Sequence, residues 1–431
     1  MTATRTETDP TATCTVAMLP WGDRFEDFHD KIGISLEAFR TELTGGWLFN
    51  YVEAMQGAGL RPVLFYVSVR VPSTLRFTHV PTGASVIVLP APMIHRKLRG
   101  ARDRYWPRSK LLQSICSYVA TPWRALARQL RQERCDAILC HEYDHPRFDV
   151  AVWVGALLRI PVFATFQGAK GPRSWIEVPL RRLAIRRAAG LVIAAETERQ
   201  RVRGRYRLPP RRIASTPNPF DTRRWRPGNR SAARLELGIP DDVVVVEWQG
   251  RVQVTRKGLD VLLDAWARVC DEVEEQVLLV LVGTGRDDEM LRRAIGGHRH
   301  APSIYWVDHY VRDRAALWNY LCAADISVLP SRHEGFAVAA VEAMACGLPL
   351  VASDAPGVAD ALGSRDSRAG IIVPIADPVA LAGGLTRLIR DPALRTAHGR
   401  RGRQRADQHF SIEKVGAELR RFITARGAFR T

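Results

Sequence analysis

Short runs of β-branched and aliphatic residues recur along the chain, and a stretch with apolar residues at helical spacing follows most of them. In the first half these runs cover residues 14–20, 63–69, 84–90, 136–140, 162–166 and 191–195. In the second half they cover residues 243–250, 278–283, 303–307, 325–330, 348–353 and 370–374. Strands that alternate with helices are typical of parallel sheets with crossover helices. The pattern therefore predicts two α/β domains.

The segment between the two series differs in composition. Residues 216–242 are rich in Pro, Arg and polar side chains and contain no long apolar run, which suits a connection between domains. We therefore expect an N-terminal domain over residues 1–220 and a C-terminal domain over residues 221–431. A final helix over about 411–425 has an apolar stripe, and we expect it to pack back on the N-terminal domain. The stripe consists of Val415, Leu419, Phe422 and Ile423.

The composition is that of a folded globular protein, with 46% hydrophobic and 25% charged residues. The 63 Lys and Arg exceed the 45 Asp and Glu, so the net charge is +18, and such a surplus is typical of proteins with polyanionic partners. Here the cations are almost all Arg and are spread along the whole chain. Nucleic-acid binders concentrate them on one face or interleave them with stacking aromatic residues. We therefore predict that nucleic acid is not a partner.

The sequence shows neither a membrane span nor a secretion signal. The longest apolar stretch, residues 150–166, is interrupted by Arg159 and Pro161, and the first residues lack the basic and apolar regions of a signal peptide. The seven cysteines are odd in number and form no C-x-x-C pair, so they predict neither a disulfide framework nor a zinc site. We expect a cytoplasmic protein.

The most informative segment for chemistry runs from Val328 to Gly357. A strand ends at Pro330, a short loop follows, and a helix covers about 337–346. The helix N-terminus then lies at the carboxyl edge of the sheet, where free amides and the helix dipole favour an anionic ligand such as a diphosphate. Gly335 lets such a ligand approach the backbone closely.

Four charged residues are candidates for contacts with such a ligand, two within this segment and two before it. Glu334 in the loop and Glu342 on the helix are candidates to accept hydrogen bonds from sugar and ribose hydroxyls. Arg251 and Lys257 follow the first strand of the second domain and can offer a forked donor and a point charge to one diphosphate. Lys257 is one of only six lysines. The alternative is that Glu342 is a solvated helix carboxylate and that both cations are ordinary surface residues.

Together these segments carry a resemblance to a known family. Residues 334–353, 250–258, 279–291 and 216–227 resemble the retaining family-four glycosyltransferases, in which an E-x(7)-E element is combined with an Arg and a Lys that hold the donor diphosphate. The similarity spans roughly residues 190–385. It implies the GT-B architecture, in which two Rossmann-like domains face each other across a cleft, the N-terminal one binding the acceptor and the C-terminal one the nucleotide sugar.

The resemblance also implies roles for individual residues. Arg251 and Lys257 would bind the diphosphate, Glu334 the donor sugar, and Glu342 the ribose. The backbone groups of Gly335 and Phe336 would contact the sugar and phosphate.

In the first domain the family places a Gly-Gly loop against the donor phosphates, which Gly45 and Gly46 match. The chain departs from the family pattern by the insertion of residues 21–44 before this loop, where acceptor recognition can reside. The family also has a His near the transferred sugar. His141 is the candidate, with His145 as its competitor, because open α/β sheets bind ligands at the carboxyl ends of their strands.

The implied activity is retaining transfer of a hexose from a nucleotide-diphosphate sugar to an acceptor hydroxyl, with His141, Glu334, Lys257 and Arg251 as catalytic residues. Fixed cations would stabilise the leaving diphosphate, so no metal and no cofactor beyond the donor substrate is predicted. The sequence Glu142-x-Asp144 is the alternative, a weak divalent-ion site. A nucleotide-sugar epimerase of the same fold also stays open.

Residues 96–130 provide the evidence on the acceptor. Seven cations occur from Arg96 to Lys110 beside a single acid, Asp103, and an amphipathic pattern follows. This composition is typical of helices that lie on an anionic membrane. It favours a lipid-linked or cell-envelope glycan precursor as acceptor and a peripheral location on the inner face of the membrane. The alternative is that the helix packs on the sheet, the basic segment is a solvated loop, and the acceptor is a soluble small molecule.

Overall fold

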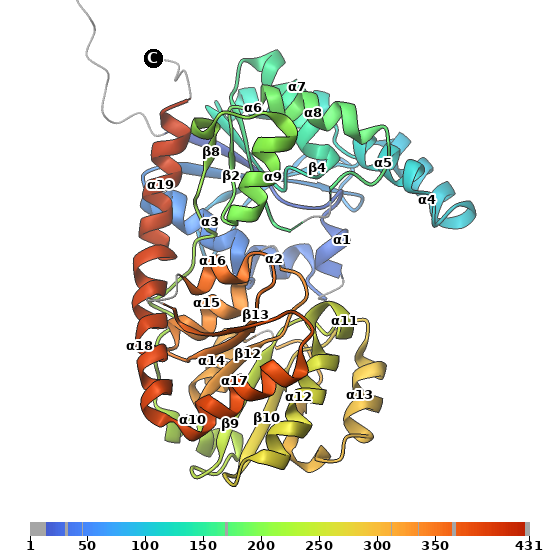
Figure 1. The fold of residues 1–431 in the computed structure, drawn as a ribbon. Coiled ribbons are helices and arrows are strands. Elements are labelled where there is room, and N and C mark those ends of the chain that lie inside the picture. Colours follow the sequence, from blue (N-terminus) through green and yellow to red (C-terminus); the bar gives the residue numbers. More distant parts are fainter. Residues whose placement is uncertain are drawn as a thin grey trace, which may run out of the picture. The chain divides into compact units, whose positions relative to one another are not determined.

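The computed structural model describes residues 14–30, 33–44, 46–168, 171–311, 313–334, 336–363 and 368–426. The chain divides into two compact units, each with its own sheet (Figure 1). Unit 1 contains the residues up to Ala194, Glu198–Pro219, and the C-terminal segment from Ile412. Unit 2 contains Ala195–Thr197 and Phe220–Ser411.

The sheet of unit 1 has the strand order β3-β4-β2-β1-β5-β6-β7-β8. Only β3 runs antiparallel to its neighbour. The central strands are buried along their whole length, as expected for a sheet covered on both faces. The strands are β1 Thr15–Leu19, β2 Arg61–Ser68, β3 Leu75–Thr78, β4 Ser85–Pro90, β5 Ala137–His141, β6 Val162–Thr165, β7 Gly190–Val192 and β8 Ile213–Ala214.

Helices cover both faces of this sheet and enclose two apolar clusters. One face holds α1 Glu26–His29, α2 Leu36–Thr41, α3 Gly46–Gly57 and α19 Ile412–Thr424. The other holds α6 Trp123–Gln132, α7 Pro146–Leu158, α8 Glu177–Arg187 and α9 Glu196–Tyr206. Two further helices, α4 Met93–Tyr105 and α5 Lys110–Val119, pack on each other, and α5 also packs on α7.

The sheet of unit 2 is entirely parallel, with the order β11-β10-β9-β12-β13-β14. Its strands are β9 Val244–Gln249, β10 Val277–Val282, β11 Ile304–Val307, β12 Ile326–Leu329, β13 Leu350–Ser353 and β14 Gly370–Val373. One face is covered by α14 Arg314–Ala323, α15 Val338–Ala345, α16 Val358–Leu362 and α18 Pro392–His409. The other is covered by α11 Val254–Lys257, α12 Leu259–Glu272, α13 Asp288–Gly296 and α17 Pro378–Arg390. A short helix, α10 Arg230–Leu237, packs on α14.

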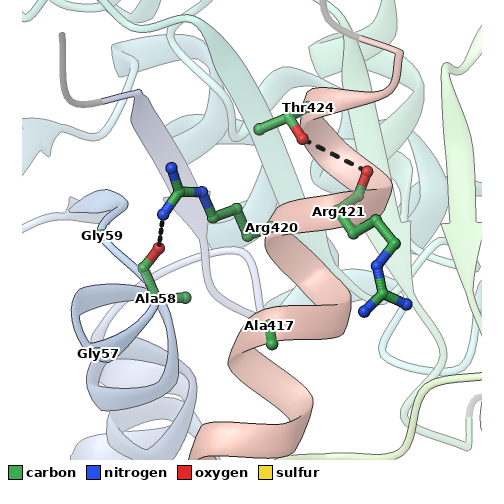
Figure 2. A pocket seen from close by; sticks show the side chains of 7 residues that line it. All are labelled: Gly57, Ala58, Gly59, Ala417, Arg420, Arg421 and Thr424. Carbon is green, nitrogen blue, oxygen red and sulfur yellow. Dashed lines mark hydrogen bonds between the residues drawn. The ribbon is translucent and has the colours of Figure 1, made fainter. Parts of the chain in front are cut away.

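The C-terminal helix α19 packs against α3 within unit 1. Its residues Val415, Leu419 and Ile423 are fully buried. Gly416 allows the close approach, because a Cβ there would lie 2.2 Å from the carbonyl oxygen of Ala54. Beside this contact, the guanidinium of Arg420 donates a 2.8 Å hydrogen bond to Ala58 at the end of α3, across a shallow hollow of about 550 Å³ (Figure 2). The apolar stripe of the predicted final helix is thus the surface that holds α19 to α3.

The prediction of two α/β units with parallel sheets is confirmed, and every predicted strand is present. Two strands were not predicted. Strand β3 alternates Leu, Arg, Phe and Thr on an exposed edge, so it lacks a continuous apolar run. Strand β8 has only two residues.

Candidate functional site

The predicted cation and the predicted loop carboxylate of unit 2 form an ion pair. The Nζ atom of Lys257 lies 2.7 Å from Oε1 of Glu334. The hydroxyl of Ser331 donates to the same oxygen at 2.7 Å. Glu334 is buried, whereas Lys257 is half-buried. A cation and a carboxylate are therefore held together at the carboxyl edge of the sheet, although 77 positions separate them in the sequence.

Further contacts hold the α11–α12 segment, which carries Lys257, against the loop after β12, which carries Glu334. Arg332 binds the carboxylate of Asp260 through two bonds of 2.7 Å, and its backbone amide donates to the carbonyl of Arg256. Gly258 adopts φ +70° and passes close to Pro330, whose carbonyl oxygen would lie 2.0 Å from a Cβ at residue 258. A glycine is required here for both reasons.

The other predicted residues of this region differ in their surroundings. Arg251 follows β9, is exposed, and makes no ion pair with a residue that the structure describes. Phe336 is half-buried, and its ring lies 5.9 Å from that of Phe410. Gly335 lies outside the described residues.

Glu342 is buried on α15 and is not a solvated helix carboxylate. The side-chain amide of Gln249 donates a 2.8 Å hydrogen bond to its Oε2 atom, and Arg314 lies 3.8 Å from Oε1. Burial raises the pKa of Glu342 to about 7, against the weaker effect of Arg314. The carboxylate is thus oriented from the end of β9 and accepts hydrogen bonds in a partly desolvated place.

A second acid, Glu247, lies on β9 on the same face as Gln249 and is fully buried. It accepts a 3.1 Å hydrogen bond from Ser327, and its other oxygen has no partner among the described residues. Burial, and to a smaller extent the charge of Glu342, raises the pKa of Glu247 to about 8. Glu247 therefore carries a proton at neutral pH.

This proton makes the stability of the protein depend on pH. The folded protein keeps it while the unfolded chain loses it between the ordinary pKa of 4.5 and about 8. Stability should therefore fall as pH rises through this range, with a slope of up to about 1.4 kcal/mol per pH unit from this group. Urea unfolding at several pH values should show that Glu247→Gln removes this part of the slope, whereas Glu275→Gln, on the surface, should leave it unchanged. An unchanged slope in Glu247→Gln would refute the assignment.

In unit 1, Gly46 begins α3 with φ +71°, a conformation that suits glycine. Its predicted neighbour Gly45 lies outside the described residues. His141 ends β5 and is buried against the rings of Trp47 and Tyr51, at centroid distances of 4.9 and 4.8 Å. Neither ring nitrogen of His141 hydrogen-bonds to a described residue.

Burial lowers the pKa of His141 to about 3. The imidazole is therefore neutral and offers one donor and one acceptor to a hydroxyl. Its competitor His145 is already engaged, since its Nε2 atom lies 3.2 Å from Asp23 and its Nδ1 atom accepts from the amide of Arg147.

Glu142 and Asp144, the alternative divalent-ion site, both interact with other groups of the protein. The Asp144 carboxylate lies 3.1 Å from Arg181 and 3.5 Å from Arg201. Glu142 accepts from the backbone amides of Asp144 and Gln167, and its own φ is +108°. Among the residues that the structure describes, no group of three or more His, Cys, Asp or Glu is arranged to hold a metal ion.

The insertion over residues 21–44 forms α1 and α2 and packs into unit 1. Phe25 and Phe39 are fully buried. The buried guanidinium of Arg147 donates to the carbonyls of Pro20 and Asp23 at 2.8 and 2.6 Å. The start of the insertion is thus fixed to the first turn of α7.

The sequence did not predict several residues that orient these groups. In unit 2 they are Gln249, Arg314, Ser331 and Arg332, and in unit 1 they are Trp47 and Tyr51. Gln249 could most easily have been predicted from the sequence, because it is a polar residue at the end of an apolar strand.

Two family descriptions match the chain. Residues 49–224 match Glycosyltransferase Family 4, and residues 244–391 match Glycosyl transferases group 1.

A search of the described helices found none with the length and hydrophobicity of a membrane span. All seven cysteines are free thiols.

Curated relatives are similar over about half of their length. The D-inositol 3-phosphate glycosyltransferase of Saccharomonospora viridis is 32% identical over 246 residues, which cover 56% of either chain. The D-inositol 3-phosphate glycosyltransferase 2 of Catenulispora acidiphila is 37% identical over 195 residues, which cover 43% of this chain and 44% of that one.

Solved structures share the fold over almost the whole chain. Sucrose-phosphate synthase from Thermosynechococcus elongatus aligns with a TM-score of 0.70 at 21% identity and covers 96% of this chain and 98% of that one. Anabaena HepE in complex with UDP aligns with a TM-score of 0.70 at 15% identity, covering 95% of this chain and 100% of that one. Such low identities support the fold alone, and the fold is the GT-B architecture of two Rossmann-like units. The two family matches together span most of the chain, and on them the chain belongs to the family-four glycosyltransferases.

Proposed function

We propose that the protein is a retaining hexosyltransferase that moves a sugar from a nucleotide-diphosphate donor to an acceptor hydroxyl. The observation that carries this proposal is the ion pair of Lys257 with Glu334 at the carboxyl edge of the unit 2 sheet. In the family pattern these two types of residue bind the diphosphate and the donor sugar, respectively. An epimerase, the competing activity, would need no acceptor.

The charges of unit 2 fit this role. Lys257 and the exposed Arg251 supply positive charge for the departing diphosphate, which becomes more negative as the glycosidic bond to it breaks. Glu334 and Glu342 are acceptors for sugar and ribose hydroxyls, and Gln249 orients the second of them. In unit 1, the neutral His141 is suited to bind a sugar hydroxyl, because neither of its ring nitrogens hydrogen-bonds to a residue that the structure describes. Retention is proposed to follow from deprotonation of the acceptor by the departing diphosphate on the same face of the sugar.

Two acceptor classes are candidates. The basic segment 96–130 favours a lipid-linked or cell-envelope glycan precursor, used at the inner face of the membrane by a cytoplasmic enzyme. The names of the relatives favour a soluble phosphorylated polyol such as D-inositol 3-phosphate.

A screen of nucleotide-diphosphate sugars by thermal shift and product analysis tests the proposal. A ligand at 100 times its dissociation constant stabilises the folded protein by about 2.7 kcal/mol. We expect one donor to raise the unfolding temperature and to release free nucleotide only when an acceptor is added. Conversion of the sugar nucleotide into its epimer without an acceptor would contradict the proposal.

Transfer should survive chelation of divalent ions. Because Lys257 and Arg251 are fixed cations, EDTA should leave the rate of product formation unchanged, and added Mg²⁺ or Mn²⁺ should not raise it. If EDTA abolishes transfer and a metal ion restores it, the carboxylates of Glu142 and Asp144 become the residues to test.

A further inference from the structure

The outer surface of helices α4 to α8 in unit 1 combines exposed apolar and basic side chains. Twelve large hydrophobic side chains are exposed here, and Trp175 is the most exposed of them at 75%. They are Met93, Ile94, Tyr105, Trp106, Leu111, Trp123, Trp153, Leu157, Trp175, Val178, Leu180 and Leu183. We call this surface the α4–α8 face.

The packing of the helices explains why the exposed residues of α6 and α7 lie on one side of unit 1. Leu126 on α6, Phe148 on α7 and Ile185 on α8 are buried against the same side of the sheet. Trp123, Trp153 and Leu157, which are exposed on α6 and α7, therefore lie on the side away from the sheet. Helix α5 packs between α4 and α7, and α8 packs on α7 (Figure 1), so the layer is continuous.

The predicted basic segment 96–110 belongs to α4 as far as Tyr105, and residues 106–109 connect α4 to α5. Leu126 and Leu130 of the amphipathic pattern are buried in the core of unit 1.

Charge is sorted between the inside and the outside of this layer. Asp149 and Glu177 are buried beside Arg181, and Asp103 is the one exposed acid among the described residues from 93 to 187. The exposed cations include Lys97, Arg108, Arg124, Arg128, Arg182 and Arg186. Although arginines are spread along the whole sequence, the exposed charges of this surface are almost all positive.

The aromatic residues of the face are interleaved with these cations. The guanidinium of Arg124 lies 5.1 Å from the ring of Trp123, and that of Arg187 lies 4.8 Å from the ring of Trp153. Tryptophan favours the headgroup region of a bilayer, and arginine can keep its charge at the surface while its stem is buried. Apolar residues surrounded by cations are the pattern of helices that lie in an anionic bilayer interface.

We propose that the α4–α8 face docks unit 1 on a membrane surface rich in anionic lipids. The proposal extends the predicted segment 96–130 to α7 and α8, and it rests on the proposed function only in placing the acceptor at the membrane. A second copy of the chain fits the face less well, because a two-fold contact would bring its cations against one another. The tryptophans among the cations would also suit nucleic acid, but the exposed aliphatic residues beside them, such as Met93 and Leu157, do not stack on bases and favour a lipid surface. Nucleic-acid binding is therefore the competing outcome of the test.

Vesicle co-sedimentation of the full chain, without donor or acceptor, tests the docking. We expect binding to phosphatidylcholine vesicles that contain phosphatidylglycerol, no binding to phosphatidylcholine alone, and release at high salt. The double variant Arg182→Glu/Arg186→Glu should weaken binding about 30-fold or more, since each lost cation costs about fivefold. Trp153→Ser/Leu157→Ser should weaken it as well.

Matched controls are available in unit 2. Arg268→Glu changes an exposed cation and Leu235→Ser changes an apolar residue that is 85% exposed, and neither should alter binding. Circular dichroism and the unfolding temperature check that every variant is folded. The proposal would be overturned if the protein does not bind anionic vesicles, or if the control variants weaken binding equally. It would also be overturned if the apolar variants abolish a dimer instead, or if the protein binds nucleic acid and not lipid. Failure of the proposed function has a separate signature, because vesicle binding would persist while no nucleotide sugar stabilises the protein.

Discussion

Lys257→Ala should reduce sugar transfer by about 10²–10³ while leaving the fold intact, the typical loss when one preorganised group for a developing charge is removed. The ammonium group is the partner of Glu334 and is half-buried at the edge of the sheet. The positive charge of Lys257 interacts most strongly with the diphosphate when the glycosidic bond breaks and the diphosphate becomes more negative. In the variant, kcat should therefore fall more than the affinity for the donor. Steady-state kinetics with the donor found in the screen measures both quantities.

The control for this variant is Lys414→Ala, which removes another Lys–Glu pair. Lys414 lies 3.6 Å from Glu418 on α19, in unit 1, and its removal should leave kcat unchanged. Glu334→Gln should resemble Lys257→Ala in activity, because the amide loses the charge yet can still accept the hydrogen bond from Ser331. Full activity of either unit 2 variant would show that the donor binds elsewhere.

The strands and their grouping could be predicted because they depend on local pattern. Apolar runs such as that of β9 are buried on both sides in a parallel sheet and remain visible in the sequence. Strand β3 lies on an edge and has mostly exposed side chains, so no pattern identified it.

The site was predicted only in part, because its geometry depends on contacts between distant segments. The sequence and the family resemblance indicated Lys257, Glu334 and Glu342. They did not indicate that Arg332 and Asp260 join the loop after β12 to α12, since neither residue stands in an unusual pattern. Burial also changed the chemistry of individual groups. Glu247 lies within an apolar strand, and its proton follows from the desolvation that the fold imposes.

Gly258→Ala should destabilise unit 2 and disturb the donor site together. A Cβ at residue 258 would meet the carbonyl oxygen of Pro330 at 2.0 Å. Such a contact with backbone cannot be relieved by a side-chain rotation. The end of α11, which carries Lys257, must therefore move away from the loop that carries Glu334. We expect a loss of unfolding free energy beyond the roughly 1–2 kcal/mol that a left-handed conformation costs a non-glycine residue.

Gly238→Ala separates the two causes. Gly238 has φ +67°, close to the +70° of Gly258, but nothing lies within 4 Å of a Cβ built there. It should therefore show the conformational cost alone, with transfer and donor affinity unchanged. In Gly258→Ala, urea unfolding should reveal the additional loss, and donor binding should weaken because Lys257 and Glu334 no longer lie 2.7 Å apart. Equal stability losses in the two variants, with donor binding intact in both, would show that the contact of Gly258 with Pro330 does not position the ion pair.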